Sequence, residues 1–372
     1  MTSHYPSQRS RIYFLMQVVL TTFCVTGAVL FVGYTIANSE THDFGVYYYS
    51  AKAALQGATV YNVYGPYELP YWYFPWLAWF FIPLAIFPIQ TAYFVYIGLS
   101  IILAWGSMDY LARRFDSSRS MPERLLIISM SLLLCWLVYR VGQMDFILLA
   151  VAVWMIHMID RKDTFPAGVL TPILLFKPHL FIIFLPFAAL KGGRKFFASA
   201  FIVTAAFLAA STMITPDWPT QMMQLLARSG QRTDNNWGFT TFPNMLGWQE
   251  NWSGTANLPF TVALIIAGMI FIWGVRSLPA FPLLSLALVA SLFCAPRAYS
   301  YNFPLLLPAL TWVTAGLKKP YQTIIWIVAG MIPFWFRFSS GSYSIVLAVF
   351  SAGLVKAYWI QKHTDTINTH WE

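Results

Sequence analysis

A small group of ionisable and strongly polar residues interrupts a chain that is otherwise almost wholly apolar. These residues are His42, Asp43, Arg140, Gln143, Asp145, Lys177, His179, Arg297, Tyr301, Asn302 and Arg337. A charged side chain at membrane depth costs roughly 2.5 kcal/mol or more, so several at one level indicate a wet, polar cavity. Arginine binds phosphate through two parallel hydrogen bonds and lysine binds it as a point charge. We therefore expect the cations of the group to bind a lipid phosphate, and they are Arg140, Lys177, Arg297 and Arg337.

Asp43 is the residue of this group best suited to act as a base. A carboxylate beside a cationic pocket can take the proton of a hydroxyl that attacks a sugar with a phosphate leaving group. Asp43 also precedes a helical apolar pattern that predicts an amphipathic surface helix ending near Gly57. The apolar positions are Phe44, Tyr47, Tyr48, Ala51, Ala54 and Leu55. Asp43 would be the N-cap of that helix, and capping alone would account for an aspartate. Both roles stay open.

The elements that must position these residues are membrane helices. Of 372 residues, 58% are hydrophobic and 10% are charged, and long apolar runs recur along the chain. A run of about 20 apolar residues crosses a hydrocarbon layer of ~30 Å. The runs lack the alternation of barrel strands, so we predict an all-α polytopic membrane protein. The net charge of +9 is scattered between the runs, which indicates lipid head groups as partners rather than nucleic acid.

Prolines and the positive-inside rule set the predicted topology. Arg9 and Arg11 place the N-terminus in the cytoplasm. The prolines of segment 71–88 divide it into pieces too short to span, so we favour an interfacial position over a crossing. Lys177-Pro178 breaks another run into two short helices that go out and come back. We predict a single membrane domain, 1–372, of about twelve crossings, with outer loops at 38–89 and 216–258 and the polar residues at the outer, periplasmic face.

Simpler explanations exist for several of the polar residues. Arg140 and Arg337 could reach the outer head groups as helix-end side chains. The segment from Gln143 to Asp145 could cap the helix that follows it. Asp43 and Asp145 could coordinate a divalent metal through oxygen, but two carboxylates distant in sequence are weak grounds for a metal site. We therefore expect no metal and no other cofactor.

Five segments resemble glycosyltransferase family 87 in their order and spacing, over roughly residues 12–308. The segments are HDFGVYYYSAKAALQGATVYNVY, YFPWLAWFFIPLAIFP, GQMDFILLA, LLFKPHLFIIFLP and CAPRAYSYNFPLLLP. This family belongs to the C-fold membrane glycosyltransferases and includes polyprenol-phosphate-mannose-dependent mannosyltransferases. The resemblance implies an inverting transfer of a sugar, mannose first among the candidates, from a polyprenyl-phosphate donor. The acceptor would be a glycolipid, a polysaccharide or another molecule at the outer face.

The same resemblance implies roles for individual residues. Asp43 would be the general base, and Gln143 and Lys177 match the Gly-Gln and Lys-Pro motifs of the family. The chain departs from the family pattern at 74–76, where Phe-Pro-Trp replaces Tyr-Pro-Pro. A second departure is the segment PRAYSYN, where many members carry a histidine. This segment offers Arg297, Tyr301 and Asn302 instead.

Two other classes of function compete with an enzyme. A transporter or flippase of a lipid-linked saccharide would need polar residues along a full path through the membrane, often in repeated halves. This chain instead gathers its polar residues at one predicted face. A structural scaffold without a ligand would leave the cations among them unexplained. We therefore favour the enzyme.

Overall fold

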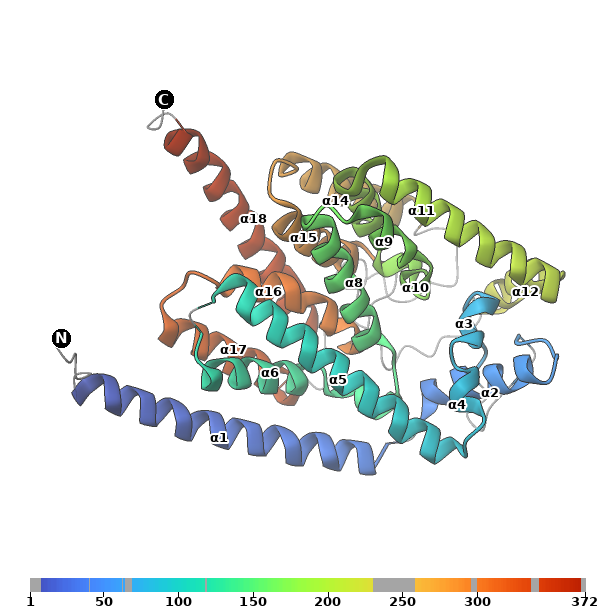
Figure 1. The fold of residues 1–372 in the computed structure, drawn as a ribbon, viewed down its shortest axis with the longest axis horizontal. Helices are drawn as coiled ribbons and strands as arrows, with labels where there is room; N and C mark the ends of the chain where they lie inside the picture. The colour runs from blue at the N-terminus through green and yellow to red at the C-terminus, as the bar shows by residue number, and fades with distance from the viewer. Residues whose placement is uncertain are drawn as a thin grey trace.

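The computed structural model describes residues 8–39, 41–61, 63, 69–117, 119–229, 258–295, 300–335 and 341–368. All regular elements in these ranges are helices (Figure 1), as predicted. In chain order they are α1 (Gln8–Ala37), α2 (His42–Leu55), α3 (Pro75–Trp79), α4 (Ile82–Ala85), α5 (Ile89–Phe115), α6 (Met121–Leu134), α7 (Trp136–Val141), α8 (Asp145–Asp160), α9 (Thr164–Val169), α10 (Thr171–Leu174), η1 (Pro178–Leu180), α11 (Phe184–Ile214), α12 (Trp218–Ser229), α14 (Leu258–Gly274), α15 (Ala280–Cys294), η4 (Ser300–Leu306), α16 (Leu307–Thr314), α17 (Lys319–Trp335) and α18 (Gly341–Asn368).

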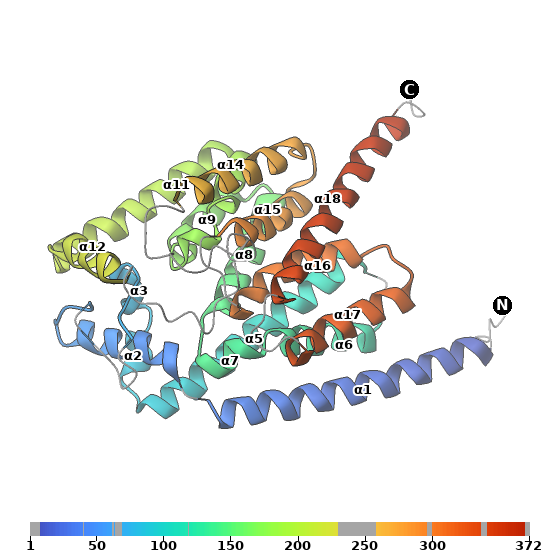
Figure 2. The ribbon, with the colours of Figure 1, turned by 180° about the vertical axis from the view of Figure 1, so that it is seen from behind.

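Three of the described helices are long and apolar enough to cross a membrane. They are α1 from Leu15, α5 and α11, whose apolar windows have mean hydropathies of 2.1, 1.5 and 2.0. α1 runs beside α6 and α7 (Figure 2). The helical membrane protein predicted from composition is therefore confirmed at this level. The count of about twelve crossings and their orientation stay predictions.

The segment between α2 and α5 is broken into short helices, as its prolines predict. α3 and α4 have 5 and 4 residues, far fewer than a crossing needs. Pro75 begins α3, Pro83 is the second residue of α4 and Pro88 immediately precedes α5. Proline lacks an N–H and fits the first turn of a helix, where that N–H has no partner within the helix. Each proline therefore lies in the first turn of a helix or immediately before it, and none continues the previous helix.

The predicted amphipathic helix is present as α2, but its first residue differs from the prediction. α2 begins at His42 with Thr41 at the N-cap, so Asp43 is the second helical residue, and the prediction that it caps the helix is wrong. The predicted end is confirmed: α2 stops at Leu55, and Gly57 follows with φ +70°, the left-handed conformation that glycine adopts after a helix. The location of α2 on a membrane surface stays a prediction.

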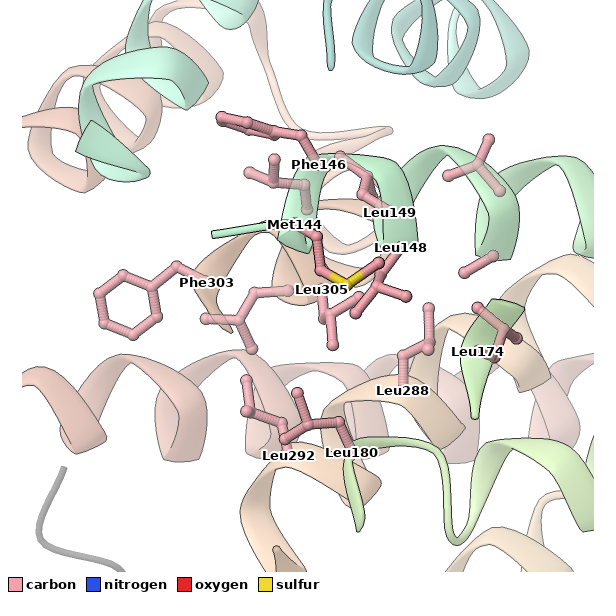
Figure 3. Close-up of a cluster of buried hydrophobic side chains, with 14 of the residues drawn as sticks. Met144, Phe146, Leu148, Leu149, Leu174, Leu180, Leu288, Leu292, Phe303 and Leu305 are labelled. Carbon is pink, nitrogen blue, oxygen red and sulfur yellow. The ribbon is translucent and has the colours of Figure 1, made fainter. Parts of the chain in front are cut away.

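α8 lies at the centre of the packing. It contacts α5, α9, α15 and η4, and its first turns bury Met144, Phe146, Leu148 and Leu149 against neighbouring helices. Figure 3 shows the other walls of this cluster, formed by Leu174, Leu180, Leu288, Leu292, Phe303 and Leu305. Such packing matters because lipid tails are as apolar as leucine, so van der Waals fit, rather than escape from water, drives helices together in a membrane. The start of α8 is therefore firmly held.

The predicted break at Lys177 is confirmed. Lys177 has φ −129° and ψ 69°, outside the helical region, and it separates α10 from η1. The backbone freed by this break is bonded to protein, since the N–H groups of Ile183 and Phe184 donate to Ser291 Oγ at 3.1 and 3.0 Å. α11 is itself two helices joined at Gly193, whose φ is +67° and ψ −159°. Irregular backbone at membrane depth requires such partners.

Candidate functional site

Four buried polar side chains from separate parts of the chain meet at one end of α8. Lys177 Nζ donates to Asp145 Oδ2 at 2.6 Å and to Gln143 Oε1 at 2.8 Å. Asn302 Nδ2 donates to Asp145 Oδ1 at 2.6 Å. All four residues are at most 4% exposed. We call Gln143, Asp145, Lys177 and Asn302 the polar cluster; each of its members was a predicted site residue.

Local backbone geometry explains how these residues come together. Gly142 ends α7 with φ +73°, and a Cβ atom there would lie 2.6 Å from Phe44 Cβ. Glycine thus gives both the left-handed turn and the close approach of α2 to the α7–α8 turn. Asp145 is the first residue of α8, where the helix dipole favours a carboxylate. Asp145 does not cap the helix, because both of its carboxylate oxygens accept hydrogen bonds from side chains of the polar cluster.

Lys177 is saturated by protein groups. An ammonium has three N–H donors; two of them bind Asp145 and Gln143, and the ring centroid of Tyr301 lies 4.6 Å from Nζ. A cation over an aromatic face at this distance is attracted by the ring. These contacts offset the cost of burying the Lys177 ammonium. The described residues enclose it, whereas we predicted that it would face an open polar cavity.

Gln143 links the polar cluster to α2. Its Oε1 atom accepts from Lys177 Nζ and also from Tyr47 OH at 3.0 Å. Two donors on one oxygen fix which end of the amide faces them, so the Nε2 donor is directed elsewhere. Tyr47 is fully buried, and its hydroxyl lies 3.3 Å from that of Tyr73. Tyr47 was not a predicted site residue, because its helical spacing indicated only an apolar face.

Asp43 lies beside the polar cluster but is only half-buried. Burial raises the pKa of the Asp43 carboxyl, while a hydrogen bond from Gln143 and the positive charge of Lys177 lower it. His42 lowers the pKa as well, and Asp145 raises it. These interactions bring Asp43 into electrostatic contact with three predicted site residues that lie about one hundred or more positions further along the chain.

Of the remaining cations and histidine predicted for the site, the structure describes Arg140 and His179. Arg140, on α7, is half-buried with its guanidinium 5.8 Å from the ring of Trp136. His179, on η1, is half-buried two residues after Lys177. Arg297 and Arg337 lie outside the described residues. The cation-rich character predicted for the site therefore depends on residues other than the polar cluster, which with Asp43 holds two carboxylates and one ammonium.

The same side chains do not form a cluster of metal ligands in the described parts of the chain. In the ranges that the structure describes, no group of three or more His, Cys, Asp or Glu side chains is arranged to hold a metal ion. Both carboxylate oxygens of Asp145 accept hydrogen bonds, one from Lys177 and one from Asn302. What the site offers chemically is one carboxylate on a half-buried residue, Asp43, beside a buried network of hydrogen bonds. Such a carboxylate can accept a proton.

Comparison with known proteins identifies the family. The model of glycosyltransferase family 87 matches residues 71–308, more than half of the chain. This range contains the whole polar cluster and begins after Asp43 and Tyr47. No curated protein and no solved structure matches the chain. Because the family model covers the helical core together with the cluster, this helical chain belongs to glycosyltransferase family 87 and is a glycosyltransferase.

Proposed function

We propose that the protein moves a sugar, mannose first among the candidates, from a polyprenyl-phosphate donor to an acceptor at the outer, periplasmic face of the membrane. Asp43 is the general base of this transfer. The observation that supports the proposal is the pairing of a half-buried aspartate with a buried polar cluster, in which Gln143 and Lys177 oppose the rise in the pKa of Asp43 that burial causes. A base must be ionised and must reach the substrate, and Asp43 alone among the described acidic residues of the site has the exposure for it.

The chemistry needs one base and a stable leaving group. Asp43 takes the proton of the acceptor hydroxyl as its oxygen attacks the anomeric carbon from the face opposite the phosphate. The bond from that carbon to the phosphate oxygen breaks, and the electron pair leaves with the phosphate, so the configuration inverts. A phosphate monoester is already anionic, hence no acid has to protonate it. Preorganised cations can stabilise its developing charge.

In this proposal Lys177 acts mainly on the pKa of Asp43 and does not bind the donor phosphate directly. Its contacts with Asp145, Gln143 and Tyr301 would have to break before the ammonium could bind a donor phosphate. Left in place, it holds a positive charge near Asp43 and opposes the rise in the pKa of that carboxyl that burial causes. The phosphate-binding role that we proposed for all four cations therefore falls mainly to Arg140, Arg297 and Arg337.

The proposal is tested with full-length protein in lipid nanodiscs, radiolabelled polyprenyl-phosphate mannose and an acceptor-lipid extract. Asp43→Asn should lower the transfer rate by at least about a hundredfold, since a general base contributes roughly 10²–10⁴ in rate, with donor affinity unchanged. The control is Asp163→Asn, which removes an exposed carboxylate after α8 and should leave transfer intact. Transfer at the wild-type rate by Asp43→Asn would remove Asp43 from catalysis. A wild type that binds the donor without transfer would reject mannose or the acceptor.

A further inference from the structure

An apolar groove opens between α11 and α14. It is lined by Pro186, Phe187, Leu190, Met269, Ile270 and Trp273, and its volume is about 400 Å³. This volume falls within the range of small-ligand sites. The groove is open to the surroundings, because Ile270 and Trp273 are 66% and 50% exposed. All six lining side chains are apolar, so hydrocarbon is the chemistry that fits it.

The lining of the groove runs along α14 from the level of Cys294 toward the loop that leads to α15. α14 passes Cys294 at Gly268 before it reaches the groove residues Met269 and Trp273. α15 then returns over 15 residues, about 22 Å at 1.5 Å per residue, to Cys294 near η4. A phosphate held beside the loop between α14 and α15 would thus be separated from η4 by the length of α15.

Cations surround the turn of α11 next to the groove. Lys191, Arg194 and Lys195 flank the kink at Gly193, and Arg194 and Lys195 are exposed. Lys191 Nζ donates to the carbonyl oxygen of Leu278 at 2.8 Å. This hydrogen bond ties the turn of α11 to the loop between α14 and α15. Two loops that carry cations are thus joined beside the groove.

The second of these loops brings an arginine directly onto the groove lining. The Arg276 guanidinium lies 4.6 Å from the ring centroid of Trp273, and its Nη1 donates to the Trp273 carbonyl at 3.1 Å. Arg276 is exposed, so its other donors reach outward from the groove. The arrangement combines an apolar channel with a basic mouth, which is complementary to an anionic head group on an acyl chain.

We propose that this groove binds an anionic phospholipid, with an acyl chain along the apolar lining and the phosphate among Arg194, Lys195 and Arg276. The positive-inside rule assigns this basic end to the cytoplasmic leaflet, whose anionic lipids are recognised by basic pockets between helices. Arginine binds the phosphate oxygens in pairs and lysine adds a point charge. The proposal uses the predicted orientation of the chain but no part of the proposed sugar transfer.

Native mass spectrometry of the full-length protein in detergent tests this site. The probes are phosphatidylglycerol and phosphatidylcholine with the same acyl chains, each titrated into delipidated protein. A cation near an anionic lipid contributes roughly 1 kcal/mol, or about fivefold in affinity. The variant Arg194→Gln/Lys195→Gln/Arg276→Gln should therefore lose about a hundredfold in phosphatidylglycerol affinity and much less in phosphatidylcholine affinity, because the choline cation neutralises the phosphate of that lipid.

A control and a second variant separate the head group from the chain. Lys318→Gln removes an exposed cation from the loop between α16 and α17 and should leave the binding of both lipids unchanged. Ile270→Asn, in the lining, should weaken both lipids alike. Equal retention of phosphatidylglycerol by the triple variant and the control would overturn the proposal. Equal wild-type affinity for the two lipids would overturn it too, as would displacement of phosphatidylglycerol by a polyprenyl phosphate.

Discussion

Lys177→Met removes one charge of the buried ion pair while it keeps a side chain of similar length. Nζ and Asp145 Oδ2 are 2.6 Å apart, and the two side chains are 5% and 0% exposed. At an effective dielectric constant of about 20 their attraction is about 6 kcal/mol, and the cost of removing both charges from water offsets most of it. Without Lys177, Asp145 stays buried and uncompensated. We therefore expect the free energy of unfolding to fall by about 3–5 kcal/mol.

The assay is unfolding of the purified full-length protein, followed by tryptophan fluorescence. Lys319→Met is the matched control, because Lys319 pairs with Glu123 at 2.9 Å but is 46% exposed, and an exposed pair contributes only about 0–1 kcal/mol. The double variant Lys177→Met/Asp145→Asn should recover at least half of the lost stability, since it leaves no unpaired charge. Equal stability of Lys177→Met and Lys319→Met would refute the reasoning, and so would a double variant no more stable than Lys177→Met alone.

Three further predictions concern the base and its supports. Tyr47→Phe removes one of the two donors to Gln143 and should cost about 1 kcal/mol in unfolding free energy, with a fall in kcat rather than a rise in KM; an unchanged kcat would detach Tyr47 from the site. Gly142→Ala must fit a Cβ against Phe44 at φ +73° and should cost about 1–3 kcal/mol; a wild-type melting temperature would contradict the close approach. Burial raises the pKa of Asp43, so its contribution to stability is present below the unfolded pKa and lost as pH rises through the folded pKa. Asp43→Asn should therefore melt higher than wild type above that pH while it abolishes transfer, and a lower melting temperature there would contradict the sign of the shift.

The parts of the fold that sequence predicted are those that one residue type determines locally. The prolines of segment 71–88 and the Lys177-Pro178 pair fixed where helices could not continue, and the structure breaks at these points. The start of α2 was less predictable. Aspartate has a strong preference for the N-cap, yet the helix begins two residues earlier than predicted and uses Thr41 as its N-cap, in a left-handed conformation without a side-chain cap.

Local sequence patterns do not predict the contacts within the site. The predicted topology leaves a few polar residues unexplained, and these include all four members of the polar cluster. The sequence does not show that Lys177 binds Asp145, because 32 positions separate them and the direction of the lysine side chain depends on the break before η1. Tyr47 was not predicted either, because its role depends on a hydrogen bond to Gln143, which lies 96 positions further along the chain.

The two aspartates of the site show how environment divides similar groups between structure and chemistry. Asp145 has no exposed surface, and each of its oxygens is bound by a buried donor, so a substrate proton could reach it only if the polar cluster came apart. Asp43 is half-exposed and feels the cluster through the Gln143 amide and the charge of Lys177. When two carboxyl groups lie in environments this different, the more solvated one is free to exchange a proton and the other serves as support. Losing Asp145 should therefore lower the stability of the fold and reduce catalysis as a consequence, whereas losing Asp43 should reduce catalysis without destabilising the fold.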